Sequence, residues 1–374
     1  MERSALNGKI SFDAAGILQA PREISGTTMH PRVSVIVPVR NEEKYIGACL
    51  TSLLAQTYPM ELYEILVLDG RSSDGSREII RRIESASVNV RCLENPAATA
   101  PAAMNIGIRS SKGDVIIRAD GHNFYPPDYI ENCVKYLQET GADNVGGPWS
   151  TVAATDEFSA RLVAAILTSP FGVGGCSFRT TVKEGHVETV PFGAFRRELF
   201  DRIGLFNEKL VRNQDNELNA RIRSAGGKIF QTPALTTEYH PVASFAALLK
   251  QTFRNSQWHV FSMRQNIHSM GLRHLVPALF TASFLALSVA WLFTPAAGVG
   301  LMSLAAVYLL IALVSLRRSL QHGMAVLCVL PCAFWLFHMS YGLGTLAGLR
   351  YLFTAPRTVP IRAGQPVDGR ALRN

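Results

Sequence analysis

The feature that most constrains this chain is an uncharged apolar region near its C-terminal end. No charged side chain occurs in residues 275–316, and a second uncharged stretch, residues 319–349, is interrupted only by His322 and His338. A helix that crosses a bilayer needs about 20 apolar residues. The first stretch can hold two such helices joined at residues 294–298, and the second can hold one more. We therefore expect three membrane-embedded segments behind a polar N-terminal part.

The charges around these segments predict their orientation. Arg317 and Arg318 separate the second and third segments, as expected of a cytoplasmic loop. The first residues lack an apolar core of the length of a secretory signal, so we expect the polar part to face the cytoplasm at the inner membrane. Three full crossings would place the arginine-rich tail outside. Either the third segment is re-entrant or interfacial, or this chain departs from the tendency of Lys and Arg to lie on the cytoplasmic side.

The net charge predicts the kind of partner. At pH 7 the formal charge is +8, which suits a protein held against anionic lipid and handling anionic ligands. Nucleic acid is the alternative, but the sequence contains no nucleic-acid-binding module or basic aromatic array. We expect membrane lipid, and no nucleic acid, among the partners.

Before the apolar region, short apolar runs alternate with amphipathic segments. We predict an α/β fold with a mostly parallel sheet and right-handed crossovers from this alternation. Asn41 is expected to cap the first helix. A G-x-G-x-x-G after the first strand and a phosphate-binding Walker loop are both missing, which argues against dinucleotide enzymes and phosphate-loop ATPases. The predicted strands are 32–39, 64–69, 89–95 and 114–120, and the later predicted helices are 74–85, 100–111 and 127–140.

Two of these strands end in a carboxylate. Asp69 ends the second and Asp120 the fourth, and His122 follows two residues later. An aspartate at this place can simply begin a turn or cap a helix. In a parallel sheet, however, ligands bind at the carboxyl ends of the strands, so two carboxylates at one edge favour a binding site.

Four separated motifs resemble glycosyltransferase family 2, the inverting GT-A nucleotide-sugar enzymes. They are "VSVIVPVRNEEKYIGACLTSLLAQTYP", "EILVLDGRSSDGS", "PAAMNIGIRSSKGDVIIRADGH" and "NQDNELNARIRSAGGKI", and they cover residues 32 to about 230. With "FGVGGCSFR", "VPFGAFRRELFDRIGLFNE" and the apolar end, the chain is most similar to membrane-anchored succinoglycan-type exopolysaccharide glucosyltransferases. The resemblance implies a GT-A nucleotide-sugar-binding fold followed by a helical membrane anchor.

The resemblance implies roles for the residues at the predicted sheet edge. Pro38 and Glu42 match the loop near the base and ribose, and Asp69 matches the aspartate that hydrogen-bonds the uracil ring. Asp120 matches the first aspartate of the family's D-x-D metal motif, but His122 replaces the second. Mn²⁺ accepts both carboxylate and imidazole, while Mg²⁺ prefers oxygen. We expect Asp120 and His122 to hold a divalent metal, Mn²⁺ or Mg²⁺; the alternative for His122 is a turn residue bonded to backbone.

The resemblance also implies a catalytic base. The family places its base in an acidic pair near the start of a late helix, and here Gln214 replaces the first acid while Asp215 keeps the second. A positioned carboxylate can take the proton from an acceptor hydroxyl. The competing explanation is that Asn213, Asp215 and Glu217 only stabilise the first turn of a helix.

Three further segments are candidates for substrate contact. Residues 193–206 resemble the acceptor-side segment, in which Gly193 allows a close approach of the sugar and Phe195 or Phe192 stacks on it; a plain loop before a helix explains them equally well. Residues 171–179 are glycine-rich and predict a mobile loop over substrate, with Arg179 as a candidate phosphate contact.

Gln251 and Arg254 echo the Q-x-x-R-W motif of processive family members, although Asn255 follows Arg254. Arg254 remains a candidate diphosphate contact. His240 is a further candidate for diphosphate or metal, with a plain turn residue as the alternative.

These observations predict a membrane-anchored inverting glycosyltransferase. The resemblance implies that it moves a sugar, most simply glucose, from a UDP-sugar to a polyprenyl-diphosphate-linked glycan in exopolysaccharide biosynthesis, beside other polysaccharide-assembly proteins. The alternatives are a processive polysaccharide synthase and a non-catalytic carbohydrate-binding or scaffolding subunit. The expected parts are an N-terminal extension (1–31), a catalytic domain (32–240), an interfacial helical linker (241–274), membrane helices (275–350) and a polar tail (351–374).

Overall fold

The computed structural model of the protein describes residues 30–354. The predicted N-terminal extension and the polar tail lie almost entirely outside these residues. An eight-stranded sheet has the order β3-β2-β1-β4-β8-β5-β9-β7, and β6 pairs with β10 in a small second sheet. The strands are β1 Val33–Val39, β2 Tyr63–Asp69, β3 Val90–Glu94, β4 Val115–Arg118, β5 Asn144–Gly146, β6 Trp149–Thr151, β7 Gly185–His186, β8 Ala194–Arg196, β9 Ile229–Gln231 and β10 Thr237–Tyr239.

The fold class predicted from the sequence is confirmed, with a mixed rather than uniformly parallel sheet. Strands β1 to β4 are mutually parallel, as the strand–helix alternation predicts. Strand β8 runs antiparallel to both β4 and β5, and β7 runs antiparallel to β9. The helices that flank this sheet are α1 Ile46–Leu54, α2 Ser76–Ala86, α3 Ala100–Ser110, α4 Tyr129–Thr140, α8 Glu198–Ile203 and α9 Gln214–Ser224.

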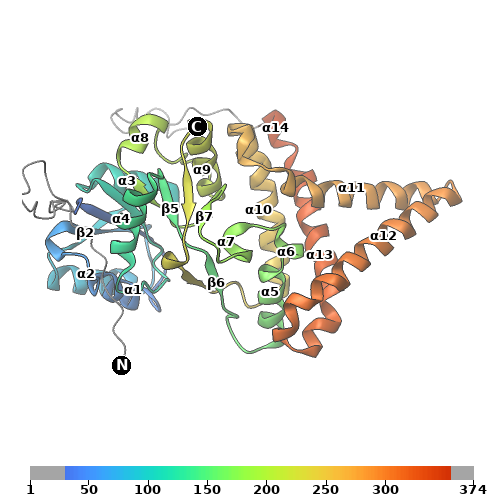
Figure 1. Cartoon of the computed structure of the whole chain (residues 1–374), viewed down its shortest axis with the longest axis horizontal. Helices are drawn as coiled ribbons and strands as arrows, with labels where there is room; N and C mark the ends of the chain where they lie inside the picture. The colour runs from blue at the N-terminus through green and yellow to red at the C-terminus, as the bar shows by residue number, and fades with distance from the viewer. Residues whose placement is uncertain (1–29, 355–374) are drawn as a thin grey trace, which may run out of the picture. The chain divides into compact units, whose positions relative to one another are not determined.

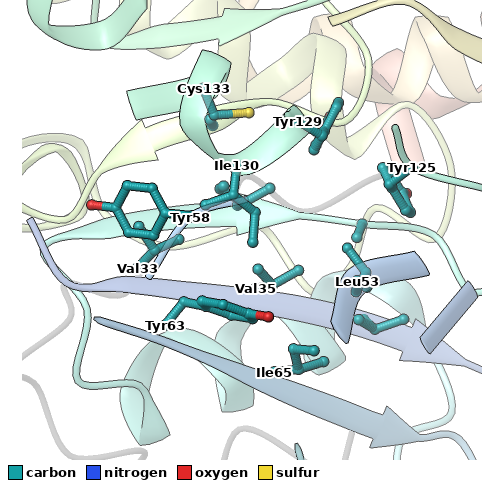
Figure 2. Close-up of a cluster of buried hydrophobic side chains, with 14 of the residues drawn as sticks. Val33, Val35, Leu53, Tyr58, Tyr63, Ile65, Tyr125, Tyr129, Ile130 and Cys133 are labelled. Carbon is teal, nitrogen blue, oxygen red and sulfur yellow. The ribbon is translucent and has the colours of Figure 1, made fainter. Parts of the chain in front are cut away.

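Two cores cover the two faces of the sheet, because successive side chains of a strand point to opposite faces. Val33 and Val35 of β1 face a cluster built from α1, α2 and α4, where Ile130 and Tyr129 are buried (Figure 2). Ile36 faces a second cluster, built from α3, α8 and α9. The sheet is therefore fully covered over its central strands, and its carboxyl edge is left for a ligand.

Two local predictions were wrong. Asn41 does not cap the first helix: α1 begins only at Ile46, and Asn41 adopts a left-handed backbone with φ of 58°. The glycine-rich segment 171–179 is not a plain loop. It contains the short helices α6 Pro170–Val173 and α7 Ser177–Thr180, and Gly174 and Gly175 between them have positive φ.

The remaining helices form the C-terminal part. Three candidate membrane spans are Leu272–Trp291, Pro295–His322 and Met324–Thr354, by length and composition, in the places that the sequence predicts. Helix α11 leads away from α13, and α12 leads back toward it (Figure 1). The three apolar helices indicate membrane association. The helices of this part are α10 Phe245–Gln265, α11 Leu272–Trp291, α12 Pro295–Ser315, α13 Met324–Gly348 and α14 Tyr351–Thr354, and the earlier helix α5 Phe158–Thr168 packs against α13. The 3₁₀ turns of the described chain are Met60–Leu62, Pro233–Leu235, Ile267–Ser269 and Leu316–His322.

Glycines bring α13 close to its neighbours. A Cβ added to Gly344 would lie 2.1 Å from Ser256 Oγ and 2.3 Å from the Phe253 carbonyl oxygen, both on α10. One added to Gly342 would lie 2.0 Å from Thr281 Oγ1 on α11. Small residues at such crossings let helix backbones approach in a membrane. The position of α10 therefore depends on α13.

We expect Gly344→Ala to destabilise this crossing. The added methyl meets backbone of α10, and overpacking of this kind costs about 1–3 kcal/mol. Thermal unfolding of the detergent-purified protein measures the loss. Gly300→Ala is the matched control, because a Cβ there would meet only the flexible Leu287 side chain, at 3.3 Å. Equal melting temperatures for the two variants would contradict the close crossing.

Candidate active site

Asp69 lies at the carboxyl edge of the sheet with its charge already paired. It is the last residue of β2 and is aligned with Val39 at the end of β1. Its side chain is 1% exposed, and Arg77 Nε lies 2.8 Å from its Oδ2. The Ser72 amide donates to the same carboxylate at 3.3 Å. The pairing with Arg77, from α2, was not predicted from the sequence.

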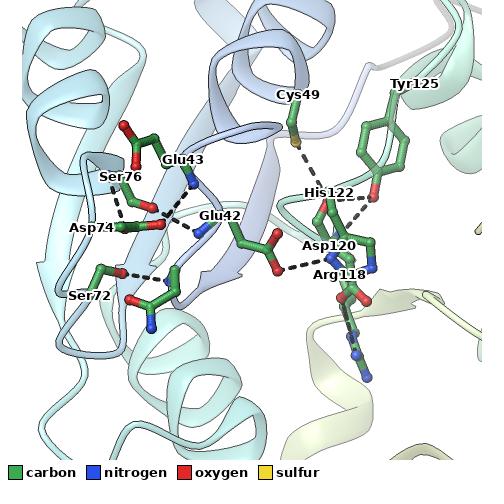
Figure 3. A network of polar contacts seen from close by, with 11 residues as sticks. Glu42, Glu43, Cys49, Ser72, Asp74, Ser76, Arg118, Asp120, His122 and Tyr125 are labelled. Atoms are coloured by element: carbon green, nitrogen blue, oxygen red, sulfur yellow. Dashed lines mark hydrogen bonds and ion pairs between the residues drawn. The ribbon is translucent and has the colours of Figure 1, made fainter. Parts of the chain in front are cut away.

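The loop after β1 is tied to the loop after β2. The Asn41 amide donates to Ser72 Oγ at 3.0 Å, and the Ser73 amide donates to Asn41 Oδ1 at 2.9 Å. The Glu42 amide donates to Ser76 Oγ at 2.8 Å (Figure 3). These bonds cross-link the two loops and explain the left-handed backbone of Asn41. They also fix Glu42 at the sheet edge.

Glu42 contacts His122, the residue that replaces the second motif aspartate. Glu42 Oε1 lies 3.1 Å from His122 Nδ1 (Figure 3). This hydrogen bond raises the pKa of His122, and the charge of Asp120 adds to the effect, while burial opposes it. The His122 side chain is 44% exposed. In the described part of the chain, no cluster of three or more His, Cys, Asp or Glu side chains is arranged to hold a metal.

Arg118 joins two carboxylates that are distant in the sequence. It is the last residue of β4, and its side chain is 7% exposed. Its Nη2 and Nε donate to Asp120 Oδ1 at 3.1 and 3.3 Å, and its Nη1 donates to Asp215 Oδ1. Burial alone would lower the pKa of Arg118, but Asp215 and Asp120 raise it above the ordinary value. One guanidinium therefore holds the two predicted carboxylates together.

Asp215 stands in the first turn of α9, where its side chain is 29% exposed. Burial raises its pKa above the ordinary value and Asp120 raises it further, while Arg118 opposes both. A carboxylate with a raised pKa is a stronger proton acceptor than a solvated one, provided that it stays ionised at the working pH. Arg118 helps to keep Asp215 ionised, because its positive charge lowers the pKa of this carboxyl.

Helix α10 holds the start of α9 in place. Asn213 Nδ2 donates to the Asn255 carbonyl at 3.0 Å, and Arg212 Nη1 donates to Asn255 Oδ1 at 2.9 Å. Asn213 itself is left-handed and makes no side-chain cap. Glu217 is buried and pairs with Arg221 one turn along α9. The helix that carries Asp215 is therefore positioned by α10, which in turn packs on α13.

The acceptor-side residues lie beside this cluster but are mostly buried. A Cβ on Gly193 would lie 2.0 Å from Asn144 Oδ1, so the glycine makes room for protein atoms. Phe195 is 2% exposed and packs on Phe200 and Phe206, which leaves its ring no free face for a sugar. Phe192, with a strained φ of 48°, lies with its ring centroid 5.5 Å from the Arg118 guanidinium.

The other predicted residues are spread around the site. Pro38 lies in β1, one position before the end of the strand. Arg254 is exposed on α10, next to Asn255, and forms no ion pair with the described residues. His240 lines a small cavity of about 170 Å³ with His122. Arg179 lies over the rings of Trp149 and Tyr239 at 4.4 and 4.9 Å, rather than at the carboxylate cluster.

Sequence reasoning missed Arg118. The available signal was a cation inside the otherwise apolar run "VIIRAD", two residues before Asp120. Charged residues are almost never fully buried unless they are paired. An arginine in a core strand therefore predicts a buried acidic partner, although only the fold identifies that partner as Asp215.

Comparison with known proteins identifies the family of the chain. The profile of glycosyl transferase family 2 matches residues 34–204. The succinoglycan biosynthesis protein ExoA of Rhizobium meliloti is 31% identical over 245 residues, 65% of this chain and 73% of that protein. A dolichyl N-acetyl-alpha-D-glucosaminyl phosphate 3-beta-D-2,3-diacetamido-2,3-dideoxy-beta-D-glucuronosyltransferase of Methanococcus voltae is 27% identical, over 85% of this chain and 97% of that protein.

A solved structure shows the same fold. The mannosyltransferase PcManGT from Pyrobaculum calidifontis, in complex with GDP-Man and Mn²⁺, superposes with a TM-score of 0.58 at 20% identity, over 85% of this chain and 88% of that one. This likeness shows that the chain has the GT-A fold. The chain belongs to glycosyltransferase family 2.

Proposed function

We propose that this glycosyltransferase moves glucose from UDP-glucose to a polyprenyl-diphosphate-linked glycan during exopolysaccharide biosynthesis, at the cytoplasmic face of the inner membrane. The observation that carries the proposal is the pairing of Asp120 and Asp215 through Arg118 at the sheet edge. The likeness to a succinoglycan biosynthesis protein and to a transferase named for a dolichyl-linked sugar phosphate supports the acceptor class.

The transfer is a single displacement that inverts the anomeric carbon. Asp215 accepts the proton of an acceptor hydroxyl while the hydroxyl oxygen forms a bond to C1 of the donor sugar. The bond between C1 and the diphosphate oxygen breaks, and its electron pair leaves with UDP. Arg118 keeps Asp215 ionised before the proton arrives, because a neighbouring cation favours the charged form of a carboxylate.

The donor is held by residues of the sheet edge and of α10. Pro38 and Glu42 contact the base and ribose, and Arg254, which is exposed and without an ion pair in the described chain, contacts the diphosphate. Asp69 accepts a hydrogen bond from the uracil ring with the acceptor capacity that Arg77 leaves. On the acceptor side, Gly193 contributes backbone; Phe195 is too buried for the stacking role.

Asp120 and His122 can supply some, but not all, of the ligands of a divalent metal ion. Asp120 offers carboxylate oxygen, and His122 has its Nδ1 occupied by Glu42, which leaves Nε2 for a ligand. The chain would supply these two ligands, and diphosphate and water oxygens would complete the set. The mixture of carboxylate and imidazole suits Mn²⁺. When bound, such an ion neutralises charge on the departing diphosphate.

The test is a panel of UDP- and GDP-sugars, supplied to the detergent-purified protein with Mn²⁺, Mg²⁺ or EDTA. We expect turnover of UDP-glucose with membrane lipid extract as acceptor, faster with Mn²⁺ than with Mg²⁺ and abolished by EDTA. Analysis of the product linkage should show inversion. Turnover of a different nucleotide sugar in place of UDP-glucose would show that the proposed donor is wrong. Undiminished turnover in EDTA would show that transfer does not need a divalent metal. A processive synthase would instead yield a polymer.

A further inference from the structure

A cavity lies between α9, the helix that carries Asp215, and α11, the first membrane helix. Its volume is about 370 Å³, and it is lined by α9, by residues 188–189, by the 3₁₀ turn Ile267–Ser269 and by the start of α11. Asn216, the neighbour of Asp215 in α9, is one of the lining residues, and Arg273 stands in the first turn of α11. The cavity therefore lies between the helix that carries the base and the place where the chain enters the apolar helices.

Positive charge in this cavity exceeds the negative charge that lines it. Arg223 Nη1 and Nη2 donate to the backbone carbonyls of Glu188 and His268, at 2.7 and 3.0 Å. These carbonyl groups carry no charge, so they do not neutralise the guanidinium. Arg273 Nη1 lies 3.2 Å from Glu188 Oε2, and the Glu188 side chain is 65% exposed. Among the described lining residues, Glu188 is the only acid and faces two guanidinium groups.

The excess of positive charge also affects the pKa of Arg223. Burial lowers the pKa of Arg223, and the nearby charge of Arg273 lowers it further, although Glu188 acts in the opposite direction. Two arginines with one exposed carboxylate between them form a site for an added anion. Arginine suits phosphate because its guanidinium donates two parallel hydrogen bonds.

The surroundings indicate that the anion belongs to a lipid. Ile267 lines the cavity and is 71% exposed, and Leu272 and Val276, at the start of α11, are 84% and 62% exposed. An apolar chain can lie along these residues while its polar head enters the cavity. Basic pockets beside membrane helices bind lipid phosphates for this reason.

We infer that this cavity binds the phosphate group of the lipid that carries the acceptor sugar, with Arg223 and Arg273 as its ligands. The inference rests on the proposed function, and it names the part of the acceptor that the protein holds apart from the reacting hydroxyl. With the carrier phosphate fixed here, the attached sugar would lie beside α9, the helix that carries Asp215.

The test uses phosphatidylcholine nanodiscs that contain the full-length protein and a few mole per cent of a polyprenyl diphosphate. We expect tight binding of the polyprenyl diphosphate and an affinity about tenfold lower in Arg223→Gln and Arg273→Gln, as loss of one charge-assisted hydrogen bond predicts. Arg223→Lys and Arg273→Lys should bind more tightly than the glutamine variants, because they keep the charge, but less tightly than the wild type, because they lose the two parallel hydrogen bonds. Arg91→Gln, at a half-exposed arginine on β3 outside the cavity, is the matched control.

Two further measurements separate the possible failures. UDP release from the donor without acceptor reports the proposed function, and it should be unchanged in the glutamine variants. Normal UDP release with unaltered carrier binding in those variants would overturn the inference alone, while no UDP release in the wild type would overturn the function. Equal binding of phosphatidylglycerol at matched charge would show a site for bulk lipid and would contradict a carrier-specific one.

Discussion

Asp215→Asn is expected to lower the rate of sugar transfer by a factor of about 10²–10⁴, the usual contribution of a general base. Asparagine has nearly the same shape as aspartate, but its amide oxygen cannot take the proton of the acceptor hydroxyl. The affinity for UDP should change little, because Asp215 lies on α9, away from the loops after β1 and β2. Single-turnover transfer and UDP binding, measured on the same preparation, give the two quantities.

This variant also distinguishes catalysis from helix stabilisation. If Asp215 served only structure, in the first turn of α9 and in the ion pair with Arg118, its replacement would lower stability, by up to about 3–5 kcal/mol, and leave the rate of the folded enzyme almost unchanged. Asp201→Asn, an exposed acid on α8, is the matched control for the chemical change. Wild-type transfer by Asp215→Asn would place the base elsewhere and overturn the mechanism.

The sequence predicted the first four strands of the sheet, β1 to β4, and the edge at which Asp69 and Asp120 lie. Apolar runs of strand length are local signals, and the parallel order of β1, β2 and β4 then places Asp69 and Asp120 at one edge. The antiparallel insertion of β8 was not predictable in this way, because its three residues lie beyond the regular alternation.

The contacts within the site were harder to predict than its position. His122 meets Glu42, 80 residues earlier, and Arg118 meets Asp215, 97 residues later. No local pattern encodes pairs at such separations; they follow from the order of the strands and from the packing of α9 on the sheet. Phe195 failed as an acceptor residue for a related reason, since a strand residue faces either the core or the ligand, and the motif alone does not say which.

Arg118→Gln is expected to move the pH dependence of transfer upward. Transfer needs the ionised form of Asp215, so the rate rises as pH increases through the pKa of that carboxyl. Burial already raises this pKa, and Arg118 opposes the rise. Removing the guanidinium removes the opposing effect, so the pKa goes up and the acid limb of the rate profile shifts to higher pH. At the pH of the wild-type optimum, less of the enzyme then has an ionised base.

The pH profile of kcat/KM for transfer measures the shift, and Arg118→Lys is the control that keeps the charge. The lysine variant should retain the wild-type limb even if its maximal rate falls, because an ammonium group cannot bridge two carboxylates as the guanidinium does. The loss of a buried ion-pair partner costs about 3–5 kcal/mol, so each profile is taken below the melting temperature of the variant. A glutamine variant with reduced rate but an unmoved acid limb would show that Arg118 only positions the two carboxylates. A shifted limb that recovers toward the wild-type rate at high pH would establish that Arg118 sets the ionisation of the base.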